Sequence, residues 1–324
     1  MDQNQITEHA VSPPVHASET SLAAVSPAAR GKAVLAAPAN NGSCSTCNSD
    51  PVSDIQQAGG AERSYVYAIG QIEMRFPSMA VEKEFAQATG RAETTGLSNR
   101  QTLQAVLAER RNRYLARQLC WVLAIEGIDT YILVPRDPAD YDLLIEGVRP
   151  VPNRGRDTDV VIGIRGPIAP AEMCNGLMIP IVIFDQVYSF DANDLVRALP
   201  KPENVAEEEF RPRAQEVYDR IVQVADNAGA TDEHRALNYL ATRYPDIYTR
   251  ANDAFAQNYA LAQVDVQPSR LGAGSRNIVT VIFTYNQRAG ATAGFFTEQY
   301  FVRVDVTEEF PFLVSPLQQG FARA

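Results

Sequence analysis

Four cysteines are the residues of this chain best suited to chemistry, because four thiolates form the ligand set of a structural Zn²⁺ site. Cys44 and Cys47 form a C-x-x-C pair, whereas Cys120 and Cys174 stand alone in the sequence. Only the first pair has the spacing of metal ligands. The sequence predicts that Cys44, Cys47, Cys120 and Cys174 converge on one zinc ion. The alternative is that Cys120 is a small buried hydrophobe and Cys174 an inert loop thiol.

Thiol-redox chemistry is a second interpretation of the C-x-x-C pair. Redox motifs usually begin a helix behind a strand, where the thiolate pKa is lowered. Cys44 and Cys47 are instead flanked by Asn, Ser and Gly. A redox protein would cycle these two cysteines while Cys120 and Cys174 stay inert. A closed site of four cysteines would stabilise the fold rather than catalyse, because it leaves no open position for a substrate.

Other catalytic groups are scarce in the sequence, which contains neither G-x-S-x-G nor H-E-x-x-H. We assign no catalytic residue. His234 is the only histidine beyond the N-terminal arm, and the predicted N-cap Thr231 gives it a capping or packing role. The acidic pair Glu308 and Glu309 follows a predicted strand and could flank a groove. An enzyme acting on a modified peptide through His234 or this pair is the alternative.

The first half of the chain predicts helices and a small mixed sheet around Trp121. Strands are expected at 64–70, 130–134, 159–164 and 177–184, and helices at about 80–88 and 138–146. A longer helix is expected from Ser98 to Gly127, with Cys120 near its end. Cys174 falls in the Pro- and Gly-rich loop at 165–176.

The second half predicts helices packed on an antiparallel β meander. Helices are expected at 203–228, with Pro212 splitting or restarting the first, and at 231–243 and 245–258. Strands are expected at 260–267, 277–286 and 295–306. The fold class is therefore α+β with two subdomains joined near Pro200. The domains are a disordered arm at 1–62, subdomains at 63–200 and 201–316, and a tail at 317–324.

Composition narrows the classes of function. The 324 residues carry a formal net charge of −10, which disfavours nucleic acids and anionic membranes as partners and leaves neutral or basic peptides open. No apolar run approaches the roughly 18 residues of a membrane span. The N-terminus lacks the basic start and apolar core of a signal peptide. We therefore expect a cytoplasmic protein with reduced cysteines.

Several long stretches resemble the C-terminal region of the PatG-type cyanobactin maturation proteins, which also occurs at the C-terminus of the PatA-type proteins. The first half contributes SYVYAIGQIEMRFPSMAVEKEFAQATGR from Ser64, RYLARQLCWVLAIEGIDTYILVPRDPADYDLL from Arg113 and RGPIAPAEMCNGLMIPIVIFDQVYSF from Arg165. The second half contributes ADNAGATDEHRALNYLATRYPDIY from Ala225 and YFVRVDVTEEFPFLV from Tyr300. The likeness covers roughly residues 63–315.

The resemblance implies a place in the maturation of ribosomally made peptides. In that family the region follows a subtilisin-like macrocyclase and is regarded as a domain without an established activity. No Asp/His/Ser triad carries over, since only the arm precedes Ser64 here. The resemblance also implies metal binding, which fits the four cysteines. We expect an accessory or scaffolding module with structural Zn²⁺, a precursor peptide or a maturation enzyme as partner, and a homodimer.

Overall fold

The computed structural model describes residues 64–91, 99–150, 157–201, 205–224, 226–272, 275–288 and 296–320. All of them lie within one compact unit, residues 49–324. The predicted arm at 1–62, with Cys44 and Cys47, lies outside the described residues. Within the described residues, no helix is long and apolar enough to cross a membrane.

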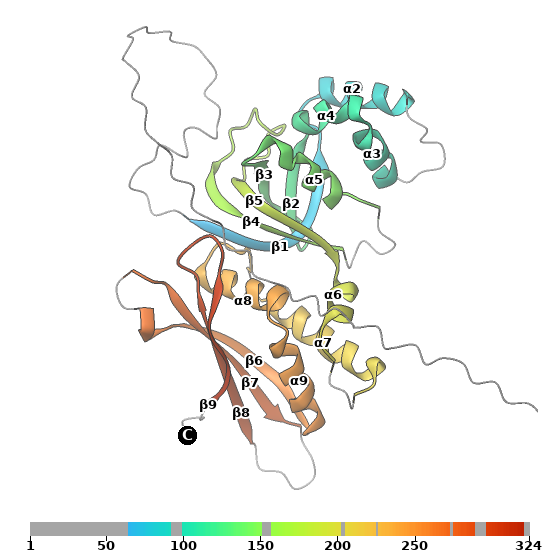
Figure 1. Ribbon diagram of the computed structural model, residues 1–324. Coiled ribbons are helices and arrows are strands. Elements are labelled where there is room, and N and C mark those ends of the chain that lie inside the picture. The colour runs from blue at the N-terminus through green and yellow to red at the C-terminus, as the bar shows by residue number, and fades with distance from the viewer. Residues whose placement is uncertain are drawn as a thin grey trace, which may run out of the picture. The chain divides into compact units, whose positions relative to one another are not determined.

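A closed barrel forms the first half of the described chain, with the strand order β1-β2-β3-β5-β4 (Figure 1). Its strands are β1 (Tyr65–Arg75), β2 (Cys120–Ile125), β3 (Ile128–Pro135), β4 (Asp157–Ile168) and β5 (Pro180–Asp191). β3 and β5 run parallel, and the other neighbours are antiparallel. Pro180 is tolerated because it is the first residue of β5.

The helical segment that was predicted from Ser98 to Gly127 ends earlier, at Gln118. α3 (Asn99–Ala108), a short 3₁₀ turn and α4 (Arg113–Gln118) are followed directly by β2, so Cys120 begins a strand. Glu126 and Gly127 then turn the chain with φ of 51° and 80°, as a two-residue type I′ hairpin requires. The apolar run at 120–125 is buried, and such a run fits a buried strand as well as a helix.

Short helices pack beside the barrel and complete its core (Figure 1). Besides α3 and α4, they are α2 (Met79–Arg91) and α5 (Tyr141–Gly147). Their buried apolar residues form one cluster with the barrel strands; it includes Phe85, Leu107, Leu115, Trp121, Leu123, Leu144, Val182 and Phe184. This packing fixes the helices against the second half of β1 and the start of β2.

The second half contains the predicted helices on a β meander, which confirms the α+β fold class. These helices are α7 (Glu207–Val222), α8 (Asp232–Arg243) and α9 (Asp246–Ala256), and α6 (Ala192–Ala198), which was not predicted, precedes them. The meander runs β6 (Tyr259–Pro268), β7 (Ile278–Gln287), β8 (Thr297–Asp305) and β9 (Phe312–Gly320). Pro212 lies inside α7 without splitting it, because burial of residues such as Phe210 and Val217 outweighs one lost hydrogen bond. β9 was not predicted, and it includes residues 317–320 of the expected tail.

The two halves share an apolar core. Tyr67, Ile69, Val160 and Ile162 on the barrel belong to the same cluster as α7–α9 and the meander. Gly229 accepts a hydrogen bond from Tyr67 N at 2.9 Å, and its φ of +69° and close approach to β1 exclude a larger residue. The buried Asn238 donates to Tyr67 O at 2.8 Å. A boundary near Pro200 stays a prediction.

Candidate functional site

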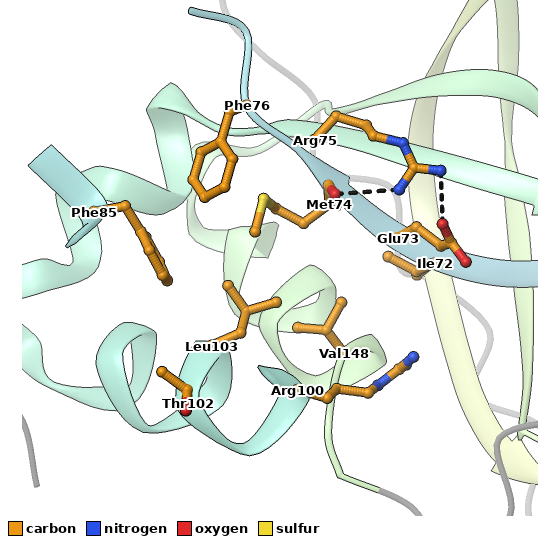
Figure 2. Close-up of a pocket in the computed structure, with 10 residues that line it drawn as sticks. All are labelled: Ile72, Glu73, Met74, Arg75, Phe76, Phe85, Arg100, Thr102, Leu103 and Val148. Carbon is orange, nitrogen blue, oxygen red and sulfur yellow. Dashed lines mark hydrogen bonds and ion pairs between the residues drawn. The ribbon is translucent and has the colours of Figure 1, made fainter. Parts of the chain in front are cut away.

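A cavity of about 400 Å³ lies along the second half of β1 (Figure 2). It is lined by Ile72, Glu73, Met74, Arg75, Phe76, Phe85, Arg100, Thr102, Leu103 and Val148. Successive side chains of a strand point to opposite faces, so a cavity lined by consecutive strand residues lies at the strand's edge. Figure 2 shows Met74, Phe76, Phe85, Leu103 and Val148 around the space between β1 and the helices. The interior is therefore mainly apolar.

The edge of β1 beside this cavity lacks a strand partner among the described residues. β1 pairs with β4 only over Tyr65–Gly70 and with β2 only over Gln71–Arg75. Ile72 N points away from β2, since it donates to the Asp159 carboxylate on β4 at 2.6 Å. Backbone groups alternate in direction along an antiparallel strand, so the N–H and C=O groups of Met74 point the same way. This segment of β1 can accept another strand.

Asp159 substitutes for the missing strand partner at Ile72. Its side chain is fully buried, and its second oxygen accepts a hydrogen bond from Ser189 Oγ at 2.5 Å. Burial raises the pKa of Asp159 to about 6, and the hydrogen bonds from Ser189 and Ile72 oppose that rise. The carboxyl group thus fixes the end of the open edge at the cost of burying a charge.

Arg100 connects the helices that form the far wall of the cavity. Its guanidinium donates to Asp157 Oδ2 at 3.1 Å, to Gly147 O at 2.6 Å and to Arg149 O at 2.8 Å. Arg149 contacts the other oxygen of Asp157, also at 3.1 Å. The Asp157 side chain is fully buried, and both of its oxygens contact a cation. The network fixes the start of α3 to the end of α5.

The charges at the rim of the cavity are paired with one another. Arg75 lies 2.7 Å from Glu73 and 3.0 Å from Asp129, and its guanidinium also donates to Met74 O at 3.3 Å. Arg100 shares the Asp157 carboxylate with Arg149. The cavity therefore offers apolar contact and strand backbone, without a free charge to attract an ionic side chain.

The structure brings two of the four predicted zinc ligands together. Cys120, at the start of β2, and Cys174, in the loop between β4 and β5, are buried and form a disulfide with a Cα–Cα distance of 5.9 Å. This pairing differs from the reduced state expected from the sequence. Because Cys44 and Cys47 lie outside the described residues, the convergence of all four cysteines stays a prediction. Among the described residues, no group of three or more His, Cys, Asp or Glu side chains could hold a metal.

The other candidate residues do not line the β1 cavity. Thr231 accepts a hydrogen bond from His234 N at 3.2 Å, which confirms the predicted N-cap, and burial lowers the pKa of the imidazole. Glu308 accepts a hydrogen bond from the Tyr65 hydroxyl at 3.2 Å. Glu309 shares a hydrogen bond with Asp185, and burial raises its pKa to about 8.

Sequence reasoning missed the polar residues that support the cavity. Asp157 and Asp159 lie in the tripeptide Asp-Thr-Asp directly before the apolar run of β4. Two acids at the buried start of a strand were the available signal for a polar network, since buried carboxylates require partners. Nothing in the local sequence pointed to Arg100 as one of those partners.

The fold is similar to that of a known protein. A solved structure titled "PatG Domain of Unknown Function" is similar to this chain with a TM-score of 0.64 and 20% sequence identity. The match covers 79% of this chain and 98% of the other. At this identity the likeness concerns the fold, an α+β architecture shared over most of both chains.

The second half of the chain matches a family model. Residues 204–319 match the family model described as PatG C-terminal. Over these residues the chain is therefore similar to the PatG C-terminal family, which supports the resemblance of its sequence. No curated protein matches the chain.

Proposed function

We propose that this protein is a non-catalytic accessory module in the maturation of ribosomally made peptides, and that it holds an extended peptide along β1. The observation that carries the proposal is the coincidence of an open strand edge at Ile72–Met74 with an apolar cavity. Peptide recognition by strand addition uses this combination, because backbone hydrogen bonds give affinity and pockets for alternate side chains give specificity. The PatG C-terminal-type domain supports the pathway.

The ligand is an extended segment with one large uncharged side chain. The added strand pairs with the Ile72 carbonyl and the Met74 backbone, since Asp159 already accepts the Ile72 N–H. Its apolar side chain enters the space between Phe85, Leu103 and Val148. A volume of about 400 Å³ lies within the range of ligand pockets, about 300–1,000 Å³. The paired rim charges and the net charge of −10 disfavour acidic segments. The peptide is presented by a precursor or by a maturation enzyme.

Binding of short synthetic peptides tests this proposal. Peptides with a central Leu, Phe or Met among neutral residues are compared with copies that carry N-methyl groups at alternate positions. Thr102→Phe, at the wall of the cavity, is expected to weaken binding about tenfold or more. Ala108→Phe, at an exposed position of the same helix, is the control and leaves binding unchanged. If N-methylation and Thr102→Phe have no effect, the strand-addition site is refuted.

We also propose a structural zinc site formed by Cys44, Cys47, Cys120 and Cys174. The contact between Cys120 and Cys174 supports it, since reduction of the disulfide would leave two thiolates side by side. A tetrahedral ion would then join them to the C-x-x-C pair and stabilise the fold. Metal analysis of protein purified reduced and without chelator is expected to find about one zinc per chain. Replacing both Cys44 and Cys47 by Ser would abolish it. Absence of zinc with reversible oxidation of Cys44 and Cys47 would favour the redox interpretation.

A peptide-modifying enzyme is the second candidate, favoured by Glu309. A carboxyl group protonated near neutral pH beside a second carboxyl, Asp185, suits a general acid. Incubation of the protein with modified peptides, followed by mass spectrometry, tests it. A covalent change that disappears in Glu309→Gln would support the enzyme, and unchanged peptide masses would support the accessory module.

The expected cytoplasmic location and homodimer belong to the same proposal. Fractionation of the producing cells and light scattering of the purified chain measure them. A secreted protein would contradict the first expectation, and a monomer at micromolar concentration would contradict the second.

A further inference from the structure

A second cavity, of about 590 Å³, lies where β2 begins and β3 ends. We propose that it binds a small monoanionic carboxylate with an apolar body. The site is separate from the β1 edge, so the inference goes beyond the proposed function and does not depend on it.

The floor of this cavity is apolar and rigid. It includes Leu119, Trp121 and Ile132, which are buried, and Met173 from the loop between β4 and β5. Trp121 Nε1 donates to Ala116 O at 2.7 Å, so the polar atom of the indole is satisfied. The disulfide of Cys120 with Cys174 holds the neighbouring Met173 close to β2. Such a surface suits an aromatic or branched aliphatic group.

Arg117 supplies the charge at the rim. It lies on α4, is exposed, and has no carboxylate within ion-pair distance among the described residues. Tyr141, whose pKa is raised by burial, lines the same cavity. An ion pair between Arg113 and Asp142 joins α4 to α5 close by and fixes this geometry. A guanidinium and a phenolic hydroxyl that line one cavity supply donors for a carboxylate.

The second arginine of the cavity explains the preference for a single negative charge. Arg136 lies 2.7 Å from Asp185 and 3.7 Å from Glu309, so its own charge is already balanced. One free cation remains among the described residues that line the cavity, and the nearby acids oppose a second negative charge on the ligand. A carboxylate therefore fits better than a phosphate dianion. It can come from a free organic acid or from the C-terminus of a peptide.

The only tryptophan of the chain, Trp121, provides a direct assay. The full chain is titrated with N-acetyl-phenylalanine and with N-acetyl-phenylalanine amide while Trp121 fluorescence is recorded. We expect saturable binding of the acid and binding of the amide about tenfold weaker or less. A short peptide ending in Phe with a free carboxylate distinguishes the two sources. If N-acetyl-phenylalanine and the peptide both bind, the cavity admits the C-terminus of a peptide. If only N-acetyl-phenylalanine binds, the cavity is a site for a free organic acid.

Two variants make the proposal falsifiable. Arg117→Gln is expected to remove the preference for acid over amide, whereas Arg110→Gln, an exposed charge outside the cavity, preserves it. Met173→Phe narrows the cavity and is expected to weaken both ligands while unfolding at an unchanged temperature. Equal binding of acid and amide to the native chain overturns the proposal. The proposal is also overturned if N-acetyl-phenylalanine gives the same fluorescence response with Arg117→Gln and with Met173→Phe as with the native chain.

Discussion

Replacing Asp159 by Asn should make the protein more stable at neutral pH. The Asp159 carboxyl accepts hydrogen bonds from Ile72 N and Ser189 Oγ. An asparagine keeps both contacts, because its oxygen accepts from Ile72 while its amide donates to the Ser189 hydroxyl. What the substitution removes is the charge, which burial makes costly. The open edge of β1 and its cavity stay in place.

The magnitude follows from the raised pKa of Asp159, about 6 in the folded protein against 3.8 for the free side chain. Below the lower value both states are protonated and the group has no effect on stability. As pH rises, the unfolded chain loses its proton first, so stability falls until pH exceeds the folded pKa. One pKa unit corresponds to about 1.4 kcal/mol, so the native aspartate costs about 3 kcal/mol at neutral pH.

Urea unfolding monitored by Trp121 fluorescence at mildly acidic and neutral pH measures this cost. Between about pH 4.5 and 7.5 the native chain should lose about 2 kcal/mol of stability relative to Asp159→Asn. Taking the difference between the two proteins cancels the titration of unrelated groups. Asp159→Ala is the control, because it leaves Ile72 N and Ser189 without their acceptor and should destabilise at every pH. A difference between native chain and Asp159→Asn that does not change with pH would refute the reasoning.

Three further predictions concern the contacts of Arg235, Glu309 and Gly229. Arg235→Met should cost about 3 kcal/mol in urea unfolding, since Arg235 is 3% exposed and donates to Val306 O at 2.7 Å; a neutral effect would contradict this anchoring role. The native protein should lose stability as pH rises toward about 8, because the pKa of Glu309 is higher in the folded than in the unfolded chain while Asp185 stays bonded. Glu309→Gln should abolish this loss, and thermal melts of both proteins over that pH range would measure it. Gly229→Ala should cost at least about 2 kcal/mol, because a Cβ at φ +69° would meet a β1 carbonyl oxygen at 2.4 Å; an unchanged melting temperature would show that the chain relaxes there.

Local sequence signals predicted much of the second half of the fold. β6, β7 and β8 were indicated by β-rich runs between turns, and α8 by its cap at Thr231. These features depend on residues close in sequence, so the alternation of apolar and polar residues and the capping residues predict them. β9 was not predicted because Pro316 and polar residues interrupt its pattern, and pairing with β8 decides its structure.

The closure of the barrel could not be predicted from local patterns. β1 pairs with β4 through one half and with β2 through the other, across about 50 to 100 residues of chain. The open edge at Met74 exists only because of that change of partner. Arg100 and Ile72, which are partners of Asp157 and Asp159, are likewise far from them in sequence. The meeting of Cys120 and Cys174 was expected from the number of cysteines, whereas their disulfide was not.

Hydrogen exchange at the Met74 amide tests the central claim most directly. This N–H lies on the side of β1 where pairing with β4 ends at Gly70 among the described residues, and strand addition would give it a backbone acceptor. With a saturating peptide that has a central apolar residue, we predict slower exchange at Met74 and unchanged exchange at Val66 and Ala68, which already pair with β4. A peptide that binds without slowing exchange at Met74 would contradict the account.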